Sequence, residues 1–288
     1  MKRNNQKFAA LVLCLMLLIS VFSGCVLEKP RVYSESVQQI PEFSGEPYVV
    51  LNHNLPEFTE KELVADSYEF YSQLDALNRC GYTMACVGRD LMPTEERGSI
   101  GQVKPTGWQT VKYDFVDGKY LYNRCHLIGF QLTGENANEC NLITGTRYMN
   151  VEGMLPFENM VADYVKETGN HVIYRVTPVF QESELVARGV QMEAWSVEDN
   201  GEGICYNVYV YNNQPGVIIN YTDGTSRLDD SAMQGQQNTY VLNTGSRKFH
   251  TEDCPQAATI SQNNRQETTT TRDMLVNQGF EPAGCCKP

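Results

Sequence analysis

A strand, a polar loop and a helix follow one another between residues 119 and 168, and this succession most constrains the fold. Lys119 to Tyr122 favour a strand, after which the chain is rich in asparagine. From Asn150 to Val165, residues suited to one helical face recur at spacings of three and four. Pro156 interrupts this pattern and predicts a kink or a helix start close to it. Thr168-Gly169 is a typical C-terminal signal for a helix.

Several other short runs rich in β-branched and aromatic residues predict strands. They lie at residues 47–52, 81–87, 171–180, 186–195, 203–211 and 216–221. Because strands outnumber helices, we expect an α+β fold with a mainly antiparallel sheet. Pro178 indicates that its strand lies at an edge or contains a bulge. The 288 residues suffice to bury one sizeable core.

The N-terminal residues predict export. Basic residues precede an apolar run from Phe8 to Phe22, which is too short to span a membrane and typical of a secretory signal. The run ends before Cys25 and resembles a bacterial lipoprotein cleavage box with Cys25 as the acylated residue. An ordinary cleaved signal is the alternative. We expect an extracytoplasmic protein of a bacterial cell envelope, lipoprotein-anchored or secreted, whose lipid anchor is its only membrane contact, and we infer no obligate protein partner.

Composition and the positions of turn-forming residues divide the chain into five parts. The predicted order is a signal peptide at 1–25, a tether at 26–45, a main domain at 46–230, a linker at 231–238 and a small Cys/His module at 239–288. About 50 residues cannot bury much core, so we expect a metal or a disulfide to stabilise the module.

The charge is acidic overall and basic in one place. A formal net charge of -12 excludes a protein whose whole surface attracts polyanions. Arg97, Lys104, Lys112 and Lys119 nevertheless precede Arg124 with few acidic residues among them. Such a patch favours phosphate contacts; scattered solvated cations are the alternative.

Three side chains in the strand, loop and helix region have the chemistry needed to hydrolyse a phosphodiester. His126 follows the predicted strand, and a neutral imidazole accepts a proton from water near pH 7. Mg²⁺ prefers oxygen ligands and needs as little as one from the protein. The Asn150 amide oxygen could be that ligand, with Glu158 holding a metal-bound water. The alternative is a structural histidine, turn-forming asparagines and a solvated glutamate.

The order of these residues resembles the motif of the DNA/RNA non-specific endonuclease family. That motif reads Asp-Arg-Gly-His, a Ser-Asn-Ile type step, an Asn nine residues later and a Glu eight residues beyond. The corresponding positions are Asn123-Arg124-Cys125-His126, Asn141-Leu142, Asn150 and Glu158. The resemblance extends from about Tyr48 to Leu228 and is strongest to the secreted bacterial DNases. It implies a ββα-metal, or His-Me finger, catalytic module.

The resemblance implies a Mg²⁺-dependent enzyme that cleaves DNA without sequence specificity and leaves 5′-phosphates. It leaves open whether RNA is a substrate as well. It implies the following roles: His126 as general base, Asn150 as ligand of one Mg²⁺ ion, Glu158 as a water-mediated metal contact, Arg124 as a phosphate contact, and Asn141 as a positioning residue. Arg97, Lys104 and Asn123 are predicted to bind substrate. A catalytically weakened nucleic-acid-binding surface lipoprotein is the alternative.

The sequence departs from the family motif at Asn123, Cys125 and Gly145, which stand where Asp, Gly and often Gln occur. If the family's Asp orients the histidine, Asn123 would still hydrogen-bond His126 but would stabilise the imidazolium less. The simplest role for Cys125 is a disulfide with Cys140. Cys80 and Cys86 form the second short-range candidate pair.

The C-terminal module resembles the Cys/His metal-binding segment of Ada-type repair proteins. Its candidate ligands are His250, Cys254, Cys285 and Cys286. Four nitrogen and sulfur ligands make a structural Zn²⁺ site, but adjacent cysteines make an awkward ligand pair. Zinc and a disulfide therefore remain equal alternatives.

Overall fold

The computed structural model describes residues 40–229 and 238–286. The predicted signal peptide with Cys25, most of the tether and residues 231–237 of the linker lie outside these ranges. In the described ranges, no helix has the length and apolar character needed to cross a membrane.

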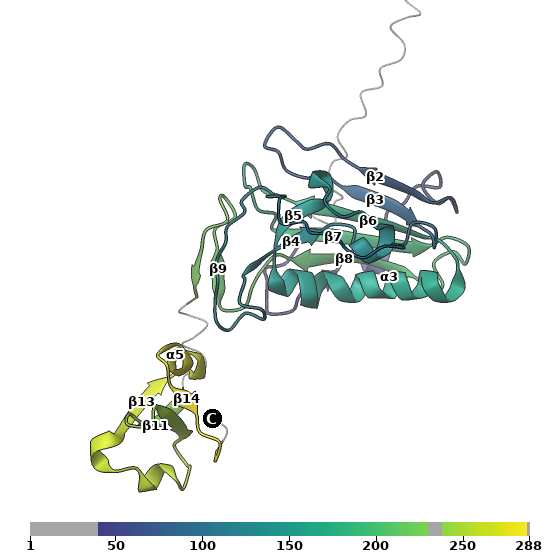
Figure 1. Ribbon diagram of the computed structural model, residues 1–288. Coiled ribbons are helices and arrows are strands. Elements are labelled where there is room, and N and C mark those ends of the chain that lie inside the picture. The colour runs from purple at the N-terminus through teal and green to yellow at the C-terminus, as the bar shows by residue number, and fades with distance from the viewer. Residues whose placement is uncertain (1–39, 230–237, 287–288) are drawn as a thin grey trace, which may run out of the picture. The chain divides into compact units, whose positions relative to one another are not determined.

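A six-stranded sheet forms the centre of the larger domain (Figure 1), and every neighbouring pair of its strands is antiparallel. The strand order is β1-β8-β7-β6-β3-β2. These strands are β1 (Tyr48–Val50), β2 (Tyr68–Tyr71), β3 (Thr83–Val87), β6 (Val172–Val179), β7 (Gly189–Ser196) and β8 (Cys205–Tyr211). The predicted α+β class with a mainly antiparallel sheet is confirmed.

Pro178 lies in β6, which is an interior strand of this sheet. Pairing of β6 with β3 ends at Val176, so Pro178 is beyond the end of β3 and pairs only with Val190 of β7. A residue without an N–H therefore occupies a local edge of the ladder, where no hydrogen bond to β3 is required.

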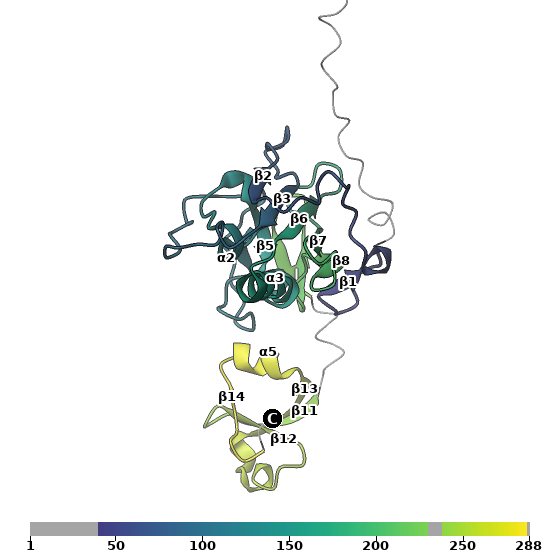
Figure 2. The same ribbon diagram turned by 90° about the vertical axis from the view of Figure 1, so that its right-hand side faces the viewer.

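A ββα module packs on one face of the sheet (Figures 1 and 2). The hairpin of β4 (Tyr122–His126) and β5 (Leu142–Thr146) is followed by the π-helix η4 (Met149–Met154) and by α3 (Leu155–Thr168). The short helices α2 (Phe130–Thr133) and η3 (Glu139–Asn141) lie between the two strands in sequence. Val161, Ala162 and Val165 of α3 join the apolar core with side chains of the sheet.

The start and end of α3 follow from local sequence. Pro156 occupies the first turn, where its missing N–H leaves no helical hydrogen bond unmade, and the preceding turn is a π-helix. Gly169 ends the helix with φ 78°, and its N–H donates to the Val165 carbonyl. The predicted helix start near Pro156 and the stop at Gly169 are confirmed.

The opposite face of the sheet is covered as well. Met84, Cys86 and Ile173 pack there against Phe58 and Leu63, which precede β2. Both faces of β3 are thus buried, which explains its continuous apolar character.

The remaining elements are short. A 3₁₀ turn, η2 (Asn52–Asn54), follows β1, and β9 (Val217–Ile219) pairs with β10 (Ser226–Leu228). The C-terminal residues form their own sheet of order β13-β11-β12-β14 around an apolar cluster that includes Phe249 and Leu275. Its elements are β11 (Asn238–Asn243), β12 (Lys248–Thr251), η5 (Ala257–Thr259), η6 (Gln262–Asn264), β13 (Arg265–Thr270), α5 (Arg272–Asn277) and β14 (Glu281–Pro282).

Asn212, just after β8, fastens the hairpin to the main sheet. Its buried side chain accepts a hydrogen bond from the Thr146 N–H at 2.8 Å and donates to the carbonyls of Thr144 and Ala187 at 3.0 and 2.9 Å. One amide therefore satisfies three backbone groups of two different segments.

We predict that Asn212→Ala lowers the free energy of unfolding by about 3 kcal/mol, because it leaves three buried backbone groups without partners. Urea denaturation of the purified protein measures this loss. Asn220→Ala, which truncates an exposed asparagine close by, is the control and should change stability by less than about 0.5 kcal/mol. Equal effects of the two substitutions would contradict the assigned role of Asn212.

Candidate active site

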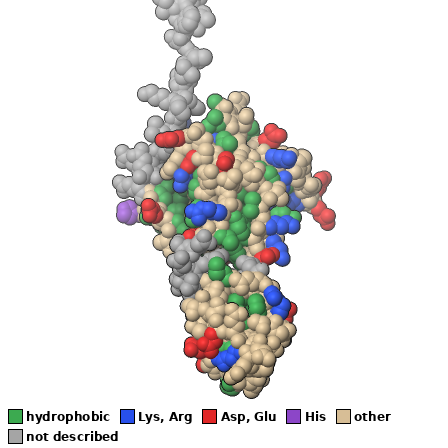
Figure 3. Space-filling view, turned by 90° about the vertical axis from the view of Figure 1, so that its left-hand side faces the viewer, with side chains coloured by type: hydrophobic (Ala, Val, Ile, Leu, Met, Phe, Trp, Pro, Cys, Tyr) green, Lys and Arg blue, Asp and Glu red, His purple; other side chains and the backbone are tan. Residues whose placement is uncertain are grey.

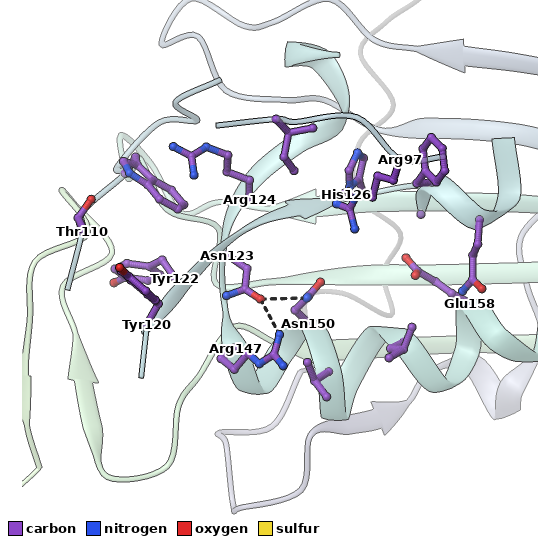
Figure 4. Close-up of a pocket in the computed structure, with 17 residues that line it drawn as sticks. Arg97, Thr110, Tyr120, Tyr122, Asn123, Arg124, His126, Arg147, Asn150 and Glu158 are labelled. Atoms are coloured by element: carbon purple, nitrogen blue, oxygen red, sulfur yellow. Dashed lines mark hydrogen bonds between the residues drawn. The ribbon is translucent and has the colours of Figure 1, made fainter. Parts of the chain in front are cut away.

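A cavity of about 860 Å³ opens beside β4, η4 and the start of α3. Figure 4 shows its labelled side chains, with Glu158 at one end, Tyr120 and Thr110 at the other, and His126 and Asn150 between them. The cavity brings together six of the predicted site residues: Arg97, Asn123, Arg124, His126, Asn150 and Glu158.

His126 is the last residue of β4 and is 6% exposed. Its Nε2 lies 2.7 Å from the Asn136 carbonyl, and its Nδ1 lies 3.1 Å from Arg97 Nη2. A guanidinium can only donate, so Nδ1 accepts and the proton of the neutral ring is on Nε2. Burial is the main cause that lowers the pKa of His126 to about 4, and the Arg97 charge adds to it. The imidazole is therefore neutral at physiological pH.

Asn150 lies in the π-helical turn η4, on the same side of the cavity as Glu158 (Figure 4). Its Nδ2 donates to Asn123 Oδ1 at 3.1 Å, and its Oδ1 accepts from the Cys125 thiol at 3.0 Å. The prediction that Asn123 hydrogen-bonds His126 is wrong. Asn123 lies three residues before His126 in β4, and its Oδ1 contacts Arg147 and Asn150 of the helical segment instead.

Glu158, in the first turn of α3, is 8% exposed. A Cβ at Gly129 would come within 2.5 Å of Glu158 Oε2, so the carboxylate lies directly against the backbone there. Burial raises the pKa of Glu158 to about 7, against the opposing influence of Arg97 and a hydrogen bond with Gln131. A solvated helix charge, the alternative for this residue, does not match this buried position.

Arg124 and Arg147 add positive charge to the cavity wall. The Arg124 guanidinium lies 4.1 Å from the centre of the Trp108 ring and donates to the carbonyls of Gly101 and Val103. Arg147 Nη2 is 2.7 Å from Asp117 Oδ2, and Arg147 Nη1 is 3.4 Å from Asn123 Oδ1. Both guanidinium groups are thus held in place by neighbouring groups.

Asn141 and Lys104 lie apart from the cavity lining. Asn141 is fully buried, and its side chain both accepts from the Ile128 N–H and donates to the Ile128 carbonyl. It ties η3 to the segment that follows His126. Lys104 is exposed and lines a separate cavity of about 320 Å³ beside Cys80. The structure does not bring Lys104 together with the other predicted substrate-binding residues.

Sequence reasoning missed Arg147, Trp108 and Tyr120 as cavity residues. Arg147 precedes Asn150 by three residues, and this helical spacing would have placed it on the same face. The two aromatic residues carry no such local signal, because they reach the cavity on a loop.

The described cysteines are all free. The predicted Cys125–Cys140 pair is wrong because the Cys125 thiol points to Asn150 and Met154 in the core. The predicted Cys80–Cys86 pair is wrong because their thiols bond different segments: Cys80 the carbonyls of Glu139 and Leu142, and Cys86 that of Val64.

His250, Cys254, Cys285 and Cys286 form a cluster in the C-terminal unit, with their ligand atoms within 4.8 Å of one another. His250 Nδ1 lies 3.5, 3.3 and 3.9 Å from the three sulfurs. Burial raises the pKa of Cys254, but hydrogen bonds with His250 and Cys285 outweigh it and lower that pKa to about 6. The predicted Cys/His cluster is therefore present, with both adjacent cysteines in it.

Comparison with known proteins identifies the larger domain. Residues 59–198 match the model of the DNA/RNA non-specific endonuclease family. These residues form a domain of that family. A deoxyribonuclease of Streptococcus dysgalactiae subsp. equisimilis is 33% identical over 111 residues, which are 36% of this chain and 32% of that protein. The matched segment thus spans about a third of that relative.

Solved nucleases share the fold of the endonuclease domain. NucA from Streptococcus agalactiae with no metal bound matches with a TM-score of 0.58 and 23% identity, over 67% of this chain and 92% of that one. The same protein with magnesium ion bound matches with a TM-score of 0.56, over 62% and 87%. Sda1 nuclease with bound zinc ion matches with a TM-score of 0.50 and 28% identity, over 64% and 97%.

Two buried titratable groups of the cavity, His126 and Glu158, affect stability in opposite directions. The pKa of His126 falls from 6.5 to about 4, so the unfolded chain binds more protons between these values, and acidification destabilises the fold there. The pKa of Glu158 rises from 4.5 to about 7, so the folded chain binds more protons there, and acidification stabilises the fold.

We therefore predict that Glu158→Gln makes stability more sensitive to acid. Without divalent metal, the unfolding free energy of this variant should fall between pH 7 and pH 4.5 by on the order of 2 kcal/mol more than that of the parent protein. Urea denaturation at both pH values measures the difference. Glu152→Gln, at an exposed position of η4, is the control. A Glu158→Gln profile parallel to that of the parent would contradict the assigned pKa of Glu158.

Proposed function

We propose that residues 46–230 are a Mg²⁺-dependent endonuclease that hydrolyses DNA phosphodiesters without sequence specificity and leaves 5′-phosphate ends. The observation that carries this proposal is the pairing, in one cavity, of a neutral His126 with the Asn150 amide. The family match and a structural neighbour with magnesium ion bound support it.

The donor set of the cavity fits a hard cation. The Asn150 amide oxygen is the proposed direct ligand, and the buried Glu158 carboxylate would hold a metal-bound water. Mg²⁺ keeps most of its waters and needs few protein oxygens. The bound ion would neutralise charge on the phosphate and the leaving oxygen.

His126 is the proposed general base, with Nδ1 as the atom that takes a proton from water. The Nε2–H bond to the Asn136 carbonyl fixes the ring and its tautomer. Arg97 covers Nδ1 at 3.1 Å, so it must turn away before water can approach. A phosphate in the cavity would attract this guanidinium and uncover the base. The departure of Arg97 also removes one cause of the low pKa of His126.

The wall of the cavity supports binding of a nucleic acid strand. Arg124 stacks on Trp108 in this wall, and Lys112, just outside the lining, has its Nζ 4.5 Å from the centre of the Tyr120 ring. Cationic and aromatic groups thus lie side by side at this end of the cavity. Figure 3 shows several Lys and Arg side chains near one edge of the larger domain, with Asp and Glu side chains beside them and apolar surface in the middle of this face. Cationic grooves with aromatic faces bind phosphates and bases together.

We further propose that the chain acts outside the cytoplasm of a bacterial cell, anchored through Cys25 or secreted. In the C-terminal module, at 239–288, we propose a structural Zn²⁺ held by His250, Cys254, Cys285 and Cys286. The distances within this cluster suit four ligands around one ion, and the lowered pKa of Cys254 favours its thiolate.

We predict that the full chain from Ser34 onward cleaves plasmid and single-stranded DNA in Mg²⁺ and loses this activity in EDTA. His126→Ala should lower the rate by about 100-fold or more, because it removes the general base. His171→Ala, which changes a histidine between α3 and β6 that pairs with Glu198 and does not line the cavity, is the matched control. Binding without turnover in Mg²⁺ would instead favour the catalytically weakened nucleic-acid-binding protein.

We predict one equivalent of Zn²⁺ per chain in protein purified without chelator, measured by elemental analysis. Cys254→Ser should reduce this content at least by half, whereas Cys205→Ser, outside the cluster, should leave it unchanged. If the purified protein contains no zinc and two of the cluster cysteines no longer react with a thiol reagent, those cysteines form a disulfide. This result would contradict the metal site.

A further inference from the structure

We propose that Asn123, Cys125 and Gly145 form one positioning unit that aims the amide oxygen of Asn150 into the cavity. These are the three positions at which the sequence departs from the family motif. Asn123 and Cys125 contact the Asn150 side chain, and Gly145 lies against Cys125. The inference rests on the proposed function, because it concerns the proposed metal ligand.

Asn123 fixes the nitrogen end of the Asn150 amide. Arg147 is held by its ion pair with Asp117 at 2.7 Å and points Nη1 at Asn123 Oδ1, 3.4 Å away. Because a guanidinium only donates, it selects the oxygen of Asn123 for this position. That oxygen in turn accepts from Asn150 Nδ2 at 3.1 Å (Figure 4). A neutral amide thus does here what a carboxylate oxygen would do.

Cys125 fixes the oxygen end. Its side chain is 1% exposed, and Sγ lies 3.0 Å from Asn150 Oδ1, closer than to the Met154 sulfur at 3.5 Å. A thiol is a weak donor, and an amide oxygen has two lone pairs. The thiol therefore occupies one lone pair and leaves the other for a cation.

Gly145 makes room for Cys125. On the neighbouring strand β5, a Cβ at Gly145 would lie 2.7 Å from Cys125 Cβ and 2.8 Å from Met149 Cε. Such distances are too short for any side chain unless the core shifts. Cysteine at 125 therefore requires glycine at 145, and the two departures from the motif belong together.

The proposed unit predicts a defined pattern of metal affinities. The test measures binding of Mn²⁺ to the full chain by calorimetry. Binding that is lost in the Asn150→Ala variant is counted as binding at the proposed site. Asn123→Ala and Cys125→Ala should each weaken this binding by about tenfold or more, the usual effect of losing a group that orients a ligand. Asn123→Asp and Cys125→Ser keep an acceptor and a donor, and should stay within about threefold of the parent.

A double-substitution cycle separates positioning from folding. Gly145→Ala alone should lower the melting temperature, and Cys125→Gly combined with Gly145→Ala should restore it without restoring Mn²⁺ affinity. If the parent protein shows Asn150-dependent Mn²⁺ binding and the Cys125→Ala and Asn123→Ala variants bind Mn²⁺ with the same affinity, the positioning unit is contradicted and the metal assignment stands. Absence of Asn150-dependent binding in the parent would overturn the metal assignment and with it this inference.

Discussion

The burial of α3 and the β4–β5 hairpin against one face of the six-stranded sheet is the constraint on which the site depends. His126 and Asn150 come from different elements, and only this packing sets their separation. Val161 and Val165 pack the helix into the apolar core. Asn212 holds the hairpin in place through three hydrogen bonds to backbone groups. Positioning by a packed core is rigid, because interiors tolerate little change in volume.

The site works largely with neutral groups. Burial keeps the His126 imidazole uncharged and raises the pKa of Glu158 to about 7, and an amide replaces the carboxylate expected at position 123. The positively charged side chains of Arg97, Arg124 and Arg147 line the same cavity. In a chain with a net charge of -12, this local excess provides an attractive surface for a polyanion that the rest of the protein would repel.

Local rules accounted for the parts of the fold that could be predicted from sequence. A proline in the first turn, a glycine stop and β-branched runs are readable because each depends on neighbouring residues, and they located α3 and most of the sheet. The contacts of Asn123, Arg97 and Cys125 could not be read in this way. Each joins segments whose meeting depends on strand register and on the path of a loop, and the disulfide predictions failed for the same reason.

Anomalous diffraction from crystals soaked in Mn²⁺ tests the central claim most directly, because it locates the ion without reference to activity. We predict one peak in the endonuclease domain, at coordination distance from Asn150 Oδ1 and on the His126 side of the cavity. A peak held by other side chains, or a cavity without a peak in protein that cleaves DNA with Mn²⁺, would contradict the account.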